Sequence, residues 1–174
     1  MDESELLATL GQLDTRLTTA FDVVIVGGAA MILHFGASRA TRDVDVIVLR
    51  GNLRQLRRAV AAVAVEAGLP EDWLNDGAKG FVGLLPPDFR TRLRPLEYPF
   101  KHLRLYALSL PDQVVLKIIA LRAQDLEDLA LLLPQVRDAD RKDVIAAMHY
   151  LNRARSDWAQ RVQYFLEEQG WNLD

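Results

Sequence analysis

The fold is decided by VVIVGG at residues 23–28 and DVDVIV at residues 43–48. The first stretch indicates a buried strand that ends in a glycine turn, and the second indicates a strand that begins with carboxylates. A short apolar segment lies between them, followed by Arg39, Thr41 and Arg42. This order of strand, glycine turn, short helix and acid-bearing strand predicts an α/β protein.

Asp43 and Asp45 have the spacing of a metal site. Residues i and i+2 of a strand point to the same face, so these two side chains project together, roughly 6–7 Å apart along the chain. Two charged carboxylates at the end of an apolar strand are costly unless water, cations or basic groups compensate them. A divalent ion such as Mg²⁺ or Mn²⁺ does so, and Mg²⁺ binds through one or two carboxylates plus substrate phosphates. The alternative is an exposed, solvated strand start.

Composition is that of a globular protein. Hydrophobic residues make up 50% and charged residues 26% of the chain, which is typical of soluble domains. No apolar stretch reaches the ~20 residues of a membrane helix, and the acidic N-terminal residues do not resemble a secretory signal. The absence of cysteine excludes disulfides and thiolate zinc sites, which is compatible with the cytoplasm. A net charge of −3 argues against nucleic-acid binding through overall charge but leaves room for a local basic face.

Helical periodicity surrounds the two diagnostic strands. Leucines from Leu6 to Leu17 recur at steps of three and four residues and predict a helix before the first strand. The alanine-rich segment 29–35 predicts a short helix that Gly36 ends. A third helix is expected from Leu53 until the Gly68-Leu69-Pro70 stop.

The second half of the chain changes from weak strands to helices. Prolines and glycines interrupt residues 70–99, where we expect strands near 81–85 and 91–96, and the alternation over 101–108 predicts another strand. We expect an α/β core over residues 1–110 and a helical subdomain over residues 111–174. The helices of that subdomain are expected at 114–123, 126–133, 142–153 and 157–169, with a start signal at Ser109–Asp112 and Ser156 as an N-cap.

Two motifs resemble a known family. Residues Gly27–Asp45 read Gly-Gly-Ala-Ala-x-x-Leu-His-x-Gly-x-x-Arg-x-Thr-x-Asp-x-Asp. This pattern resembles the nucleotidyltransferase superfamily, and more specifically the AbiEii/MenT-type toxins. The likeness continues in KIIALRAQDLEDL at Lys117–Leu129, where that family carries a lysine, an arginine and then Asp-x-x-Asp-Leu. The motifs together span roughly residues 20–133, and the resemblance implies a small mixed β-sheet with flanking helices and a C-terminal helical subdomain.

The resemblance implies roles for the acids and the lysine. Asp43 and Asp45 would bind the metal ion, and Lys117 would be a phosphate-binding group, a task that suits a compact ammonium. Asp125 and Asp128 would orient Lys117 or assist deprotonation. The alternatives are a solvated lysine on a helix, and acids that cap the helix or pair with neighbouring bases.

Further residues are candidates for nucleotide binding. Gly27 and Gly28 supply a tight turn, or let backbone N–H groups and the following helix N-terminus approach a triphosphate, and these two interpretations are compatible. Arg39 could reach a phosphate or the acceptor, whereas Arg42 beside Thr41 could simply neutralise Asp43. Arg122 is a further candidate on the C-terminal motif. A basic cluster, which alternation on neighbouring strands would gather on one face as an RNA-binding or solvated surface, comprises Arg90, Arg92, Arg94, Lys101, His102 and Arg104.

The expected reaction is the transfer of a nucleoside monophosphate from an NTP to an acceptor hydroxyl. The resemblance suggests tRNA or another RNA as acceptor, and a toxin of a toxin–antitoxin or phage-defence pair with a cognate antitoxin as partner. Many superfamily members add a third carboxylate from a later strand, and residues 101–108 offer none. Two alternatives therefore stay open: a small-molecule nucleotidyltransferase of the antibiotic-modifying kind, and a nucleotide-binding module without catalysis.

Overall fold

The structure of the protein is a computed structural model that describes residues 1–173. The chain divides into two compact units. The first, which we call the sheet unit, contains Met1–Lys79 and Leu93–Leu108, and the second, the helical unit, contains Gly80–Arg92 and the residues from Ser109 onward.

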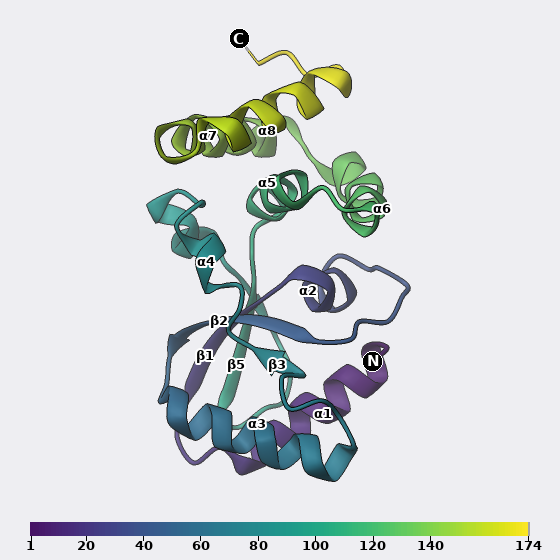
Figure 1. The fold of residues 1–174 in the computed structure, drawn as a ribbon, viewed down its shortest axis with the longest axis vertical. Coiled ribbons are helices and arrows are strands. Elements are labelled where there is room, and N and C mark those ends of the chain that lie inside the picture. Colours follow the sequence, from purple (N-terminus) through teal and green to yellow (C-terminus); the bar gives the residue numbers. More distant parts are fainter. Residues whose placement is uncertain (174) are drawn as a thin grey trace. The chain divides into compact units, whose positions relative to one another are not determined.

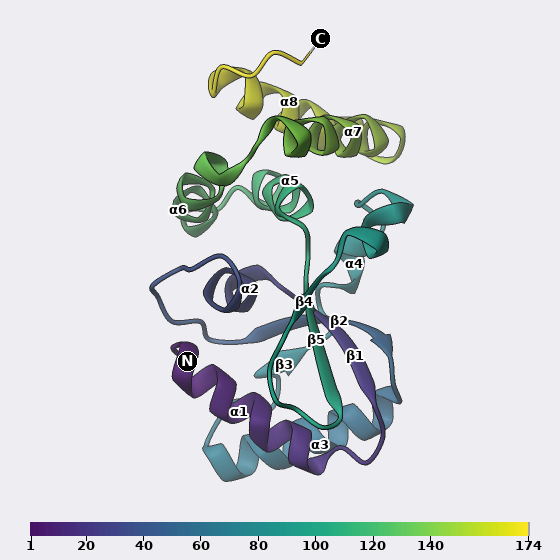
Figure 2. The ribbon, with the colours of Figure 1, turned by 180° about the vertical axis from the view of Figure 1, so that it is seen from behind.

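A mixed β-sheet organises the sheet unit. Its strands in the described residues are β1 (Phe21–Val26), β2 (Val44–Arg50), β3 (Leu74–Asn75), β4 (Arg94–Leu96) and β5 (Leu103–Ala107), in the order β3-β2-β1-β5-β4. β1 is antiparallel to β2 and parallel to β5. β3 runs parallel to β2, and β4 and β5 form the antiparallel hairpin that Figure 2 shows. This sheet and the helices around it confirm the predicted fold class.

Helices α1 (Glu3–Arg16), α2 (Gly27–Leu33) and α3 (Leu53–Ala67) supply the apolar partners of the sheet. The leucines of α1 are buried in one core with alternate residues of β1, because successive strand residues point to opposite faces. In Figure 1, α1 and α3 lie side by side. As the sequence predicted, α3 ends at Gly68, which takes the left-handed conformation at φ +64°.

Asp14 connects the end of α1 to the beginning of β5. Its carboxylate, only 7% exposed, accepts hydrogen bonds from the backbone N–H groups of Lys101, His102 and Leu103 at 2.7–2.8 Å. Buried backbone donors need partners, so this one side chain satisfies the turn that starts the strand. The carboxylate thereby fixes where β5 enters the sheet beside β1.

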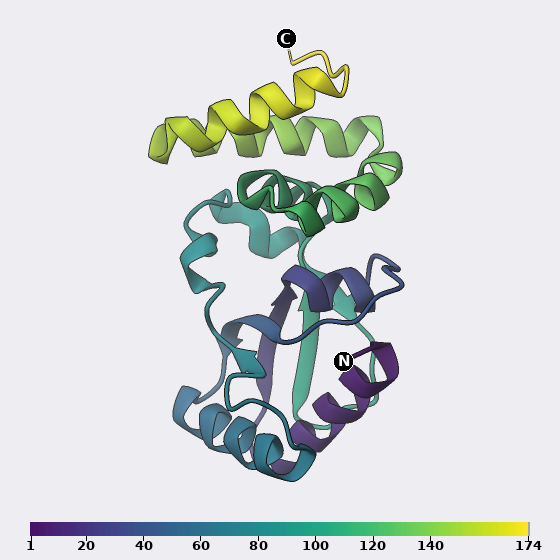
Figure 3. The same cartoon turned by 45° about the vertical axis from the view of Figure 1, so that its right-hand side comes forward.

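The helical unit follows the periodicity of the sequence. Its elements are α4 (Lys79–Val82, which starts on the last residue of the sheet unit), the 3₁₀ helix η1 (Pro87–Arg92), α5 (Leu110–Ala120), α6 (Ala123–Leu132), the 3₁₀ helix η2 (Leu133–Gln135), α7 (Asp138–Ala154) and α8 (Ser156–Glu168). Ser109 caps α5, as its start signal predicted. The prediction for α8 is wrong by one residue, because Arg155 and not Ser156 occupies the N-cap position. Figure 3 shows α7 and α8 packed side by side.

Of the two strands predicted in residues 70–99, one is wrong and one is incomplete, and a third strand was missed. The strand expected at 81–85 does not form, because residues 81–82 are the end of α4 and residues 83–85 form a turn. Of 91–96, only β4 is extended, because the residues before it form η1. The short strand β3 was not predicted, since two residues are too few to show alternation.

Candidate functional site

The register of β1 and β2 brings the glycine turn next to the acidic strand start. Val26, the last residue of β1, pairs with Asp45, and α2 begins at once with Gly27. Gly27 has φ +62°, and a Cβ atom built on it would lie 3.1 Å from Asp45 Oδ2. The Asp45 carboxylate therefore lies against the glycine backbone, in the arrangement that the order of the two motifs predicted.

Gly28 lies under the loop that leads into β2. A Cβ atom at this position would lie 2.9 Å from Thr41 Oγ1 and 3.5 Å from Arg39 Nη1. The Thr41 hydroxyl donates a hydrogen bond of 3.0 Å to the carbonyl of Asp43. The sheet unit therefore brings Gly28, Arg39, Thr41 and Asp45 together from three separate segments.

Backbone hydrogen bonds hold this loop. The Thr41 N–H donates to the carbonyl of Met1 at 2.8 Å, and the amino group of Met1 donates to the carbonyl of Thr41. Ala37 N–H donates to the carbonyl of Met31 on α2 at 2.9 Å. These bonds fix the loop at both of its ends, so Arg39 and Thr41 are presented by a supported segment.

Asp43 lies one residue before the strand. The sequence predicted that it would begin β2, but the strand begins at Val44, and both Asp43 and Arg42 are exposed. Among the residues that the structure describes, no ion pair joins Arg42 to Asp43. The role considered for Arg42, neutralising the charge of Asp43, is therefore not supported by a contact between the two side chains.

Sequence reasoning missed the second neighbour of Asp45. In the parallel ladder Asp45 pairs with Asn75, whose Oδ1 accepts a hydrogen bond from the Gly77 N–H at 2.8 Å. A Cβ atom on Gly77 would lie 3.9 Å from Asp45 Oδ1. The Asp45 carboxylate thus has a glycine on either side. The Asn-Asp-Gly turn signature at 75–77 was the signal that could have located this contact.

The donor set fits a hard divalent cation. Asp43 and Asp45 offer carboxylate oxygens, which Mg²⁺ and Mn²⁺ prefer, and at Gly27 the backbone lies against the Asp45 carboxylate with no side chain between them. Within residues 1–173, no group of three or more Asp, Glu, His or Cys side chains could hold a metal ion. Asp76, which follows Asn75 in the chain, is engaged elsewhere: a hydrogen bond from Lys79 at 3.2 Å and an ion pair with Arg57 at 3.4 Å keep its pKa below the usual range.

The C-terminal motif forms a buried charge cluster in the helical unit. Lys117 Nζ lies 2.8 Å from Asp125 Oδ1 and 2.6 Å from Asp128 Oδ2, and all three side chains are at most 6% exposed. Arg122 donates to Asp125 from both its backbone N–H and its Nε, at 3.0 and 2.8 Å. Burial raises the pKa of Asp125, but the hydrogen bonds from Arg122 and Lys117 outweigh it, and the net pKa is lowered. The solvated-lysine interpretation is therefore wrong, and the capping and pairing expected of the acids is what the structure shows.

The expected basic face on neighbouring strands does not form. Arg90 and Arg92 lie in η1, which is not a strand. Arg92 donates to Asp88 at 2.7 Å and to the buried Asp112 at 2.8 Å. On β5, Arg104 pairs with Asp22 at 2.6 Å. Arg92 and Arg104 are therefore paired with acids, and the alternation of residue types did not show these pairs in advance.

Comparison with known families agrees with this geometry. A family model described as "Nucleotidyltransferase of unknown function (DUF6036)" matches residues 4–137. The chain belongs to this family. The match covers both the glycine-and-aspartate site and the buried Lys117 cluster, and it supports the nucleotidyltransferase superfamily without extending to the AbiEii/MenT subfamily. A search of curated proteins found no match.

Membership in the nucleotidyltransferase family implies a nucleotide triphosphate as substrate and transferase chemistry in general. No helix among the described residues combines the length and the hydropathy needed to cross a membrane.

Proposed function

We propose that this protein transfers a nucleoside monophosphate from an NTP to an acceptor hydroxyl of RNA, in a reaction that depends on Mg²⁺ or Mn²⁺. The observation that carries the proposal is the Asp45 carboxylate lying against Gly27, where a side chain at the glycine would meet Asp45 Oδ2 at 3.1 Å. The acid at the start of β2 is thereby held directly beside the backbone of the glycine turn. The family match supplies the superfamily within which we interpret it.

In this proposal Asp43 and Asp45 hold the metal ion, which when bound would polarise the α-phosphoryl group and acidify the attacking hydroxyl. The acceptor oxygen forms a bond to the α-phosphorus while the bond from that phosphorus to the pyrophosphate oxygen breaks. The hydroxyl proton passes to a carboxylate or to water, and pyrophosphate leaves.

The loop and the glycines position the triphosphate. Gly27 and Gly28 carry no side chains, and in this proposal their backbone lies beside the phosphate oxygens, together with Thr41 and Arg39, which lie against Gly28. Arg39, whose guanidinium lies over Gly28, suits a phosphate contact because its planar fork binds oxygens in pairs. Thr41 and Arg42 complete this side of the proposed nucleotide site.

The proposal assigns roles to Lys117 and to the charged residues around it. As found, Lys117 is held by Asp125 and Asp128, so a contact between its ammonium and phosphate requires an exchange of partners. We propose that Asp125 and Asp128 orient the lysine, and that Arg122, which is itself paired with Asp125 at 2.8 Å, is a second candidate for a phosphate contact.

The biological role follows from the resemblance of the two motifs to AbiEii/MenT-type toxins. We propose that the protein acts in the cytoplasm as the toxin of a toxin–antitoxin or phage-defence pair, with tRNA as acceptor and a cognate antitoxin as partner. A small-molecule acceptor and nucleotide binding without catalysis are the outcomes that the following experiment would reveal instead.

The test is a transfer assay with each of the four α-³²P-labelled NTPs, Mg²⁺ or Mn²⁺, and either total tRNA or aminoglycosides. We expect label on RNA, loss of transfer with EDTA, and a decrease of at least about 100-fold in Asp45→Asn, the scale seen when one group that stabilises transition-state charge is removed. Asp72→Asn, which changes an exposed acid outside the proposed site, is the matched control. Mn²⁺ binding in the presence of NTP, followed by electron paramagnetic resonance, should weaken in Asp45→Asn and not in the control. Label on aminoglycosides alone would refute the RNA acceptor, and NTP-dependent Mn²⁺ binding without transfer to any acceptor would refute catalysis.

A further inference from the structure

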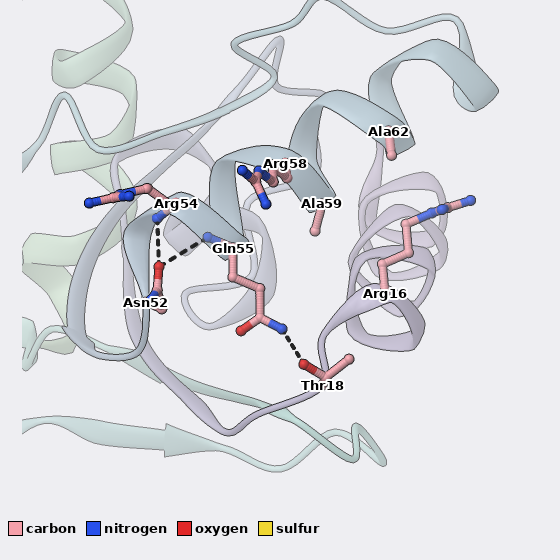
Figure 4. Close-up of a pocket in the computed structure, with 8 residues that line it drawn as sticks. All are labelled: Arg16, Thr18, Asn52, Arg54, Gln55, Arg58, Ala59 and Ala62. Carbon is pink, nitrogen blue, oxygen red and sulfur yellow. Dashed lines mark hydrogen bonds between the residues drawn. The ribbon is translucent and has the colours of Figure 1, made fainter.

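An arginine-lined pocket lies at the other end of the central strands. Its volume is about 730 Å³, and its lining residues come from the end of α1, the chain after it, and the start of α3: Arg16, Thr18, Asn52, Arg54, Gln55, Arg58, Ala59 and Ala62. Figure 4 shows the arginines on both helices and the Gln55 amide bonded to the Thr18 hydroxyl. No acidic residue lines this pocket, although the chain as a whole has a net charge of −3.

Two of these arginines are available to a ligand. Among the described residues, neither Arg54 nor Arg58 makes an ion pair, whereas Arg57 on the same helix pairs with Asp76 at 3.4 Å. Arg16 pairs with Glu66, which is itself 54% exposed. Asn52 already satisfies the start of α3 by accepting from the N–H groups of Arg54 and Gln55. The attraction for an anion therefore comes from the guanidinium groups and not from the helix end.

The position of the pocket separates it from the proposed nucleotide site within the sheet unit. Val26 pairs with Asp45 beside the glycine turn, whereas Asp22 pairs with Arg50 at the opposite end of the same two strands. The pocket begins at Asn52, just beyond Arg50. Four strand residues span about 13 Å, so a nucleotide bound at Gly27 would not place its triphosphate in this pocket. Only an extended polyanion could contact both the proposed nucleotide site and this pocket at the same time.

We propose that this pocket binds the sugar–phosphate backbone of the acceptor RNA, at a distance from the reacting hydroxyl. The proposal rests on the proposed function for the identity of the acceptor. Guanidinium groups bind phosphate oxygens in pairs. The Thr18 hydroxyl, which accepts from the Gln55 amide, keeps its own hydrogen to donate to phosphate or sugar. The volume exceeds what one phosphate fills, and Arg54 and Arg58 lie one turn apart on α3, so two neighbouring phosphates of one strand can each contact a cation.

The experiment measures binding of fluorescently labelled tRNA by anisotropy in an Asp45→Asn background, where transfer cannot alter the RNA. We compare Arg54→Gln/Arg58→Gln with Lys142→Gln/Arg153→Gln, an equal change of charge on exposed residues of α7. Over about 50 to 300 mM KCl, we expect the first pair to weaken binding about tenfold or more and to lower the slope of log K against log salt by about 1.4 to 1.8, because two phosphate contacts are lost. The control pair should leave the slope unchanged, and Arg54→Lys/Arg58→Lys should restore it.

Equal slopes for the two Gln pairs, or no binding of tRNA by any variant, would overturn the proposal. Urea unfolding of each variant shows whether a loss of binding comes from loss of folding, and the Lys pair keeps the test decisive if the Gln pair is unstable. Because the RNA-binding readout needs no transfer, failure of the proposed reaction and failure of this pocket give different results. In the protein with Asp45 intact, Arg54→Gln/Arg58→Gln should lower transfer to RNA while NTP-dependent Mn²⁺ binding stays unchanged.

Discussion

Removing the Lys117 ammonium should destabilise the helical unit strongly. In Lys117→Met a side chain of similar length fills the same space, but Asp125 and Asp128, both at most 3% exposed, lose the cation that lies 2.8 and 2.6 Å from their oxygens. Removal of one partner from a buried ion pair costs about 3–5 kcal/mol. Because Asp125 keeps its hydrogen bonds from Arg122, we expect the lower end, a decrease of about 3 kcal/mol in the free energy of unfolding.

The pH dependence of the free energy of unfolding gives a second, independent test of this ion pair. The lowered pKa of Asp125 contributes stability that is present above the pKa of an unfolded aspartate, about 3.9, and is lost as the pH falls through the folded value. Lys117 is one of the two groups that lower this pKa, so Lys117→Met loses part of that contribution. The difference between the wild-type protein and the variant should therefore be largest near neutral pH and should shrink below about pH 4.

Urea unfolding followed by circular dichroism measures both effects. Lys142→Met on the exposed side of α7 is the control, with an expected change within about 0.5 kcal/mol. Adding Asp128→Asn to Lys117→Met removes one of the two buried charges and should recover at least about 1 kcal/mol. A Lys117→Met protein within about 1 kcal/mol of wild type at neutral pH would refute the buried-cluster reasoning. If that protein also lost NTP binding, the lysine would act on phosphate directly.

Two further perturbations test the sheet unit. Gly27→Ala should lose about 1 kcal/mol from its left-handed backbone and weaken NTP-dependent Mn²⁺ binding, since the new methyl group meets the Asp45 carboxylate. Gly36→Ala, with φ +75° and open space around it, should show the same thermal destabilisation with unchanged Mn²⁺ binding, and equal effects on binding in both variants would contradict the contact. Asp14→Ala should cost about 3 kcal/mol or more in urea unfolding, because the backbone donors of residues 101–103 lose a charged acceptor. A loss below about 1 kcal/mol would show that water replaces the carboxylate.

Local signals account for what the sequence predicted well. The apolar run before Gly27 and the alternation of β5 both depend on burial of side chains within a few residues, and each was located correctly. A local signal also marks the end of α3, because Gly68 adopts a positive φ that other residues avoid. The contact of Gly27 with Asp45 followed from the order of these elements.

Two features of the site could not be derived from periodicity and propensity: the contact of Asn75 with Asp45, and the burial of the Lys117 cluster. Asn75 reaches Asp45 only through a two-residue parallel ladder. The Lys117 cluster depends on Leu121, which ends α5 with φ +44° and lets α6 return with Asp125 beside the lysine. A leucine rarely takes this conformation, so no propensity indicated the turn. The lysine consequently looked exposed by residue type although its surroundings bury it.

The surroundings of Asp45 also indicate how specificity and chemistry are divided in this protein. Gly27 and Gly77 both bring backbone close to the carboxylate, one at the start of α2 and the other just after β3. Backbone atoms can grip phosphate oxygens, which every NTP shares, but they present no side chain to read a base. Selection of the nucleotide must therefore come from side chains outside these turns. Arg39, on the loop held to Met1, lies close to Gly28 and is proposed to bind phosphate, so Arg39→Gln should weaken the binding of all four NTPs alike and leave the preference among them unchanged.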